Sequence, residues 1–138
     1  MKTPQSSQGF VLIEVLVALL IFAFGMLGLL AFQANAAKLT TESQFRTDAA
    51  SLVDELIGEM RVADPAQLKT EYAVGGSKTS AWVANRLTDS LGANATLDSL
   101  DIADGPVVGM FEVDITISWE VPGSQSGGMS YATSALIF

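Results

Sequence analysis

The sequence of this 138-residue chain predicts an α+β fold, with a long N-terminal helix and a small antiparallel sheet packed on the C-terminal half of that helix. Three patterns predict this fold. An unbroken apolar run extends from Phe10 to Phe32, a stripe of apolar residues at helical spacing runs from Phe45 to Met60, and two segments near the C-terminus alternate between apolar and polar residues. We therefore expect a leader at residues 1–9, a membrane-spanning helix at residues 10–33 and a headpiece at residues 34–138.

The apolar run is long enough to cross a lipid bilayer. At about 1.5 Å per residue, a helix from Phe10 to Phe32 measures about 34 Å, and the hydrocarbon core of a bilayer is roughly 30 Å thick. The polar leader contains Lys2 and the terminal amine, whose positive charges favour a cytoplasmic N-terminus. One charged residue, Glu14, interrupts the run. Because an acid inside a membrane is costly, Glu14 is a candidate functional residue.

Beyond the apolar run, the helix is expected to continue to Ala63 in amphipathic form. Apolar residues recur at intervals of three and four, which predicts one buried face, made of Phe45, Ala49, Leu52, Val53, Leu56, Ile57 and Met60. Asp64-Pro65 should end the helix, because the residue before a proline is disfavoured in the helical conformation.

Between the long helix and the C-terminal strands, the sequence predicts one short helix and a mostly irregular segment. Ser80–Leu91 places apolar residues on one side of a helix, and Gly92 is suited to end it. Ala93–Gly105 is acidic and is expected to be irregular, with one strand around Leu97–Ile102.

The last part of the chain predicts an antiparallel hairpin. Phe111–Val121 and Met129–Phe138 both alternate with the period of a half-buried strand. The glycine-containing segment from Pro122 to Gly128 should connect them, and one face of the pair should lie on the amphipathic half of the long helix. Trp82 and Trp119 fall within apolar patterns, so both are expected in the core.

Composition excludes several classes of function. The chain has net charge −8, which disfavours nucleic-acid binding because attraction to phosphates supplies much of that affinity. It contains no Cys and no His, so thiol nucleophiles, disulfides, zinc-thiolate sites and histidine bases are absent. We therefore expect neither an enzyme nor a bound cofactor, and we assign no catalytic and no metal-binding residues.

Two acidic groups invite a sharper interpretation. Asp98, Asp101 and Asp104 could belong to a calcium loop, but their spacing differs from that of an EF-hand loop, and a solvated acidic loop is the default. Glu112, Asp114 and Glu120 share the outer face of one strand, where a solvated surface is favoured over a catalytic carboxylate pair.

The segment from Gly9 to Leu19, with Gly9, Phe10 and Glu14 at set distances before a spanning helix, resembles the class III signal of type IV pilins and type II secretion pseudopilins. The resemblance implies that a prepilin peptidase cuts after Gly9 and methylates the new amine of Phe10. It also implies that Glu14 acts in assembly, by pairing with the N-terminal amine of a neighbouring subunit. An unpaired carboxylate in low dielectric is expensive, which agrees with such a role.

Two further segments, Gly25–Gln33 and Arg46–Pro65, resemble the PilV group of minor pilins. The resemblance covers the first half of the chain and departs from the group at Asp64, where Asn is more usual. It implies a structural subunit of a pilus priming or tip complex that promotes pilus assembly and twitching motility. The alternative is the I-type minor pseudopilin of a type II secretion system.

The same resemblance implies the partners and the location. The partners would be other minor pilins, the major pilin, the prepilin peptidase, the inner-membrane assembly platform and, as a further candidate, a tip adhesin. The protein would lie in the inner membrane with its N-terminus in the cytoplasm and its headpiece in the periplasm, and later in the pilus at the cell surface. Gly25 and Gly28 are candidates for helix flexibility during filament packing, against close helix packing as the simpler interpretation.

Two other interpretations of the N-terminus remain. Ala34-Asn35-Ala36 fits the cleavage site of an ordinary secretory signal, with Ala37 as the new terminus. The apolar run is longer than a signal peptide requires and contains an acid, which disfavours that interpretation. An uncleaved membrane anchor is the second possibility.

Overall fold

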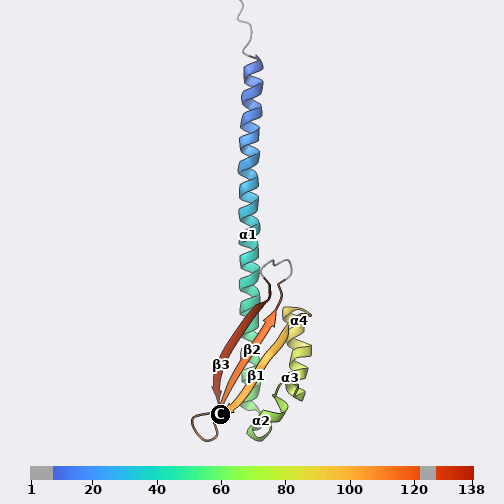
Figure 1. Cartoon of the computed structure of the whole chain (residues 1–138), viewed down its shortest axis with the longest axis vertical. Helices are drawn as coiled ribbons and strands as arrows, with labels where there is room; N and C mark the ends of the chain where they lie inside the picture. Colours follow the sequence, from blue (N-terminus) through green and yellow to red (C-terminus); the bar gives the residue numbers. More distant parts are fainter. Residues whose placement is uncertain (1–7, 122–126) are drawn as a thin grey trace, which may run out of the picture. The chain divides into compact units, whose positions relative to one another are not determined.

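The computed structural model describes residues 8–121 and 127–138, and it confirms the predicted α+β class. A long helix comes first, followed by short helical segments and a three-stranded sheet, as Figure 1 shows. The chain divides into two compact units with their boundary between Thr40 and Thr41. Residues 1–7 of the predicted leader (residues 1–9) lie outside the described residues, and the predicted boundaries at residues 9 and 33 stay predictions.

Helix α1 (Gln8–Val62) contributes to both units and agrees closely with the helix predicted from Phe10 to Ala63. Among the described residues, it is the one helix long and apolar enough to cross a membrane, and none of its most apolar stretch is buried. A helix with apolar side chains all round is stable when lipid or other helices surround it. The first unit is therefore consistent with membrane anchoring.

The second unit has one hydrophobic core, which the C-terminal part of α1 supplies from one side. The predicted stripe is confirmed: Ala49, Leu52, Val53, Leu56, Ile57 and Met60 are buried, and Phe45 packs against them. The opposite wall of the core comes from the C-terminal sheet. Its central strand contributes Val113, Ile115, Ile117 and Trp119, each at most 1% exposed.

The sheet is antiparallel with the order β1-β2-β3 (Thr96–Asp104, Phe111–Trp119 and Met129–Ile137). The predicted hairpin is confirmed, because β2 pairs with β3 from Phe111↔Ile137 to Trp119↔Met129. Residues 122–126 of the predicted connection lie outside the described residues. In β2, alternate residues point into the core while Glu112 and Asp114 are exposed, which is the pattern of a sheet with one solvated face.

Between α1 and the sheet, short helical segments cover one side of the core: α2 (Pro65–Glu71), α3 (Ser77–Trp82), the π-helical turn η1 (Val83–Leu87) and α4 (Thr88–Leu91). The Asp64 carboxylate accepts a hydrogen bond from the Ala66 N–H at 3.0 Å, and Pro65 occupies the first helical position of α2. At the start of α3, a Cβ on Gly76 would collide with the Glu71 carbonyl group. Gly92 ends α4 with φ 99°, a conformation that side-chain-bearing residues avoid.

The predicted helix over Ser80–Leu91, with its end at Gly92, and the strand around Leu97–Ile102 are both present, but their predicted extents were wrong. The helix predicted over Ser80–Leu91 begins at Ser77 and includes a π-helical turn, and α2 was not predicted. Ala93–Gly105 is not mainly irregular, because β1 extends beyond the strand expected around Leu97–Ile102 and pairs with β2 along most of its length. Its alternation is hidden by a register shift between Leu97 and Ser99.

Trp119 provides a test of this core. In a fragment that begins at Lys38, and so keeps the whole second unit, Trp119→Ala should lower the free energy of unfolding by roughly 3–5 kcal/mol, because the indole is 1% exposed. Urea unfolding followed by circular dichroism measures the change. Val108→Ala, at a fully exposed side chain, is the control and should shift stability by less than about 0.5 kcal/mol. A loss below about 1 kcal/mol for Trp119→Ala would place this residue outside the core.

Candidate functional site

The predicted processing and assembly residues all lie in the first turns of α1. Gly9, Phe10 and Glu14 are helical and exposed, and the Phe10 side chain keeps 74% of its surface accessible. Phe10 and Glu14 are four residues apart, so they lie one above the other on the same helix face. The structure thus brings the carboxylate to within about one turn of the backbone nitrogen that cleavage after Gly9 would expose.

The chemistry of Glu14 follows from what surrounds it in the sequence. From Gly9 to Ala37 it is the one charged residue, so its own stretch of helix offers no Lys or Arg as a counter-ion. A carboxylate in a lipid-like environment needs a cation or hydrogen-bond donors. Such a cation must come from the amine of a cleaved terminus or from another molecule. The arrangement is suited to forming a contact between subunits.

Gly25 and Gly28 lie three residues apart on one face of α1, which is unbroken at both positions. A Cβ added at either glycine would meet nothing within 4 Å. Neither residue is therefore required by packing within the chain. The two glycines leave a shallow strip of backbone that a neighbouring helix could approach closely, and they also lower the helix propensity there.

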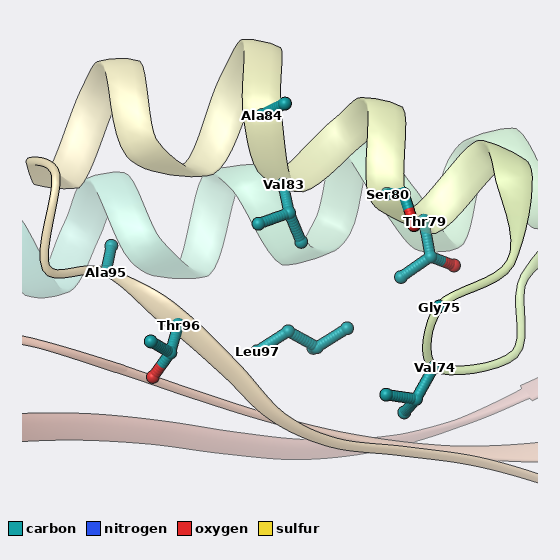
Figure 2. Close-up of a pocket in the computed structure, with 9 residues that line it drawn as sticks. All are labelled: Val74, Gly75, Thr79, Ser80, Val83, Ala84, Ala95, Thr96 and Leu97. Carbon is teal, nitrogen blue, oxygen red and sulfur yellow. The ribbon is translucent and has the colours of Figure 1, made fainter.

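The headpiece contains a groove that sequence reasoning missed. It has a volume of about 380 Å³ and lies between the α3–η1 segment and the start of β1. Figure 2 shows Val83 and Thr79 on the helical side, Leu97 on the strand side and Val74 at one end. No charged side chain lines the groove, so it suits an aliphatic group rather than an ion.

The groove coincides with two irregular features. The η1 turn belongs to the wall, and π-helical turns often occur at functional sites. The Thr79 hydroxyl is buried and has no hydrogen-bond partner in the structure, and the same holds for the indole N–H groups of Trp82 and Trp119. In the sequence, the small residues that follow Gly75-Gly76 are the one hint of this groove. Nothing in their spacing predicts a π-helical turn.

Two of the three aspartates considered for a calcium loop have other partners in the structure. Asp98 accepts hydrogen bonds from the hydroxyls of Thr96 at 2.8 Å and Ser118 at 2.9 Å, and Asp104 pairs with Lys69 at 2.6 Å. Because β1 is a strand, the prediction of a loop at Asp98–Asp104 was wrong. Within residues 8–121 and 127–138, no three acidic side chains converge closely enough to hold a metal ion.

The second face considered, made of Glu112, Asp114 and Glu120, is exposed as expected. Asn94 donates a hydrogen bond to Glu120 at 3.1 Å, which ties the end of β2 to the turn before β1. These carboxylates form a solvated surface.

Two ionisable groups of the headpiece have shifted pKa values. Burial raises the pKa of the Tyr72 hydroxyl, and the negative charges of Glu59 and Glu71 raise it further. A hydrogen bond to Glu55 and its charge raise the pKa of Arg86, whose guanidinium lies 2.6 Å from the Glu55 carboxylate. Both groups keep their usual protonation states at neutral pH, so neither is prepared for acid–base catalysis.

Comparison with protein families finds one match. Residues 4–30 match the family described as the prokaryotic N-terminal methylation motif. No curated protein and no solved structure matches the chain. The matched segment covers residues 4–9 of the predicted leader and most of the apolar run, including Gly9, Phe10 and Glu14. Together with the exposed apolar helix, it supports a type IV pilin-like protein, which is a structural rather than a catalytic kind of protein.

Proposed function

We propose that the protein is a minor type IV pilin of the PilV kind, a structural subunit of the complex that primes pilus assembly and lies at the pilus tip. The resemblance of Gly25–Gln33 and Arg46–Pro65 to the PilV group favours a minor pilin. The methylation motif on an apolar helix supports a pilin-like subunit. A helix of this kind serves as a membrane anchor first. It can then exchange lipid contacts for contacts with like helices in a filament.

The proposed assembly step uses the charge of Glu14. Cleavage after Gly9 makes Phe10 the first residue and leaves a positive amine at the N-terminal end of α1. In the filament, the Glu14 carboxylate of one subunit pairs with the Phe10 amine of its neighbour. In an apolar surrounding, this pairing lowers the free-energy cost of desolvating both charges. It also sets the register between adjacent helices.

The same proposal assigns the parts of the chain and their location. Residues 1–9 are the leader, residues 10–33 the membrane and filament-core helix, and residues 34–138 the headpiece. The precursor crosses the inner membrane once with its headpiece in the periplasm, and assembly moves it to the pilus. Its partners are the prepilin peptidase, the assembly platform, the major pilin and other minor pilins, with a tip adhesin as a further candidate. Gly25 and Gly28 allow local unwinding of the helix during packing.

The processing step makes a direct prediction. In cells with a prepilin peptidase, the mature chain should begin with N-methylated Phe10, and intact-mass measurement with N-terminal sequencing of the membrane fraction should show this. Gly9→Val should leave the precursor uncut, because a bulky side chain replaces the residue at the cleavage site. Gly58→Ala, at a position with open space around it, should be processed normally. A mature terminus at Ala37 would instead indicate a secreted protein.

Substitution of Glu14 should impair assembly without impairing insertion. Glu14→Gln keeps the size of the side chain and removes its charge, so processing and membrane insertion should be unchanged. Removing one partner of a desolvated ion pair costs ~3–5 kcal/mol. Recovery of the subunit in sheared pili should therefore fall by more than about tenfold. Glu14→Asp, which retains the charge, should recover part of the loss. Normal recovery of Glu14→Gln would show that the acid is merely tolerated.

Deletion of the gene should distinguish a pilus subunit from a secretion pseudopilin. We expect fewer surface pili and reduced twitching motility, with unchanged secretion of exoproteins, measured by counting sheared pili and assaying culture supernatants. Blocking pilus retraction should partly restore the pili, because a priming subunit shifts the balance between assembly and disassembly. Normal pili with exoproteins trapped in the periplasm would identify the chain as the I-type pseudopilin.

A further inference from the structure

We propose that residues 77–91, which comprise α3, η1 and α4, unfold and refold as one unit while α1 and the sheet stay folded. We call these residues the strap. Figure 1 shows the strap beside β1, and it forms one wall of the groove in Figure 2. This inference is independent of the proposed function, because it depends on the headpiece alone. Opening of the strap removes that wall of the groove and uncovers apolar surface that is hidden in the closed headpiece.

Glycine residues flank the strap at both ends. Gly75 precedes it with φ 82°, and Gly92 follows it with φ 99°. Glycine adopts such values, and many others, without a steric penalty, so the backbone can change direction at both positions. The hydrogen bonds of helical turns join residues that are close in sequence. The strap can therefore open without breaking any pairing between the strands of the sheet.

The closed strap buries polar groups that have no partner. The Thr79 hydroxyl and the Trp82 indole N–H make no hydrogen bond in the structure, and these two residues are only 1% and 4% exposed. A polar group buried in this way has lost its hydrogen bonds to water, and opening of the strap restores them. The two groups therefore reduce the free-energy difference between the closed and the open strap.

The interactions that hold the strap closed are weaker than those that hold the sheet. Arg86 of η1 pairs with Glu55 of α1 at 2.6 Å, but the two side chains are 54% and 37% exposed, and exposed ion pairs contribute little to stability. Leu87 and Leu91 are buried in the core, whereas the groove on the β1 side deprives the strap of dispersion contacts. β2, in contrast, pairs with a strand on each side. The strap should therefore open at a lower free energy than the sheet.

Hydrogen–deuterium exchange of the full-length protein in lipid nanodiscs tests the inference. The hydrogen-bonded amides of the strap should share one opening equilibrium constant, and their protection factors should be at least about tenfold lower than those of the β2 amides. Equal protection of the strap and β2 would overturn the inference, because the strap would then open only when the whole headpiece unfolds. Widely different protection factors along the strap would also overturn it, because the strap would then not be one unit.

Two threonines of the strap provide matched variants for the same measurement. Thr79→Val keeps the shape of the side chain and removes the unpartnered hydroxyl, so the protection of the strap amides should rise by about tenfold. The Thr88 hydroxyl donates a hydrogen bond to the Ala84 carbonyl at 2.9 Å, so Thr88→Val should not raise protection. Equal effects of the two substitutions would contradict the role given to the buried hydroxyl.

Ile137→Val separates opening of the strap from unfolding of the headpiece. Ile137 is 1% exposed in β3, and β2 lies between β3 and β1. Loss of one buried methylene weakens the folded sheet, so the protection of the β2 amides should fall by about twofold to tenfold. The protection of the strap amides should stay unchanged, because the sheet is still folded when the strap is open. A fall by the same factor in the strap would show that strap and sheet unfold together, and the inference would fail.

Discussion

The packing of one helix face against one strand holds the headpiece together. Ala49, Val53, Leu56 and Met60 of α1 lie on one side of the core, and the inward residues of β2 lie on the other. The remaining elements depend on this contact. β1 and β3 hold their positions by pairing with β2, and the short helices close the open side with Leu68, Trp82, Leu87 and Leu91. Burial of apolar surface is the main source of stability here, since the chain has neither disulfides nor zinc-thiolate sites.

The two faces that make this contact could be predicted from sequence, and so could β3, whereas α2, the π-helical turn and the full extent of β1 could not. The apolar stripe of α1 and the alternation of β2 are visible as periodic patterns in the sequence, because each element has one fully buried face. β1 buries little besides Leu100, and its register shift interrupts the alternation, so its full extent was not visible. Leu87 in the η1 turn is fully buried, and no local pattern of residues specifies a π-helical turn.

The residues of the candidate site could also be predicted from sequence only in part. The N-terminal residues were visible in the sequence because the proposed processing depends on order along the chain: Gly9, then Phe10, then one acid a helical turn later. The structure adds that all three lie exposed on an apolar helix. The groove beside Thr79 depends on the approach of two segments distant in sequence. Such a feature cannot be inferred until the topology is known.

Charged side chains are distributed differently in the two units of the chain. In α1 a single carboxylate, Glu14, stands within a long apolar stretch, where an unpaired charge is costly in a lipid environment. In the headpiece, carboxylates are abundant and solvated on β1 and on the outer face of β2, and they limit how close another acidic chain can approach. β3, in contrast, contains no charged side chain. The acidic surface of the headpiece therefore lies on β1 and β2, while β3 is neutral.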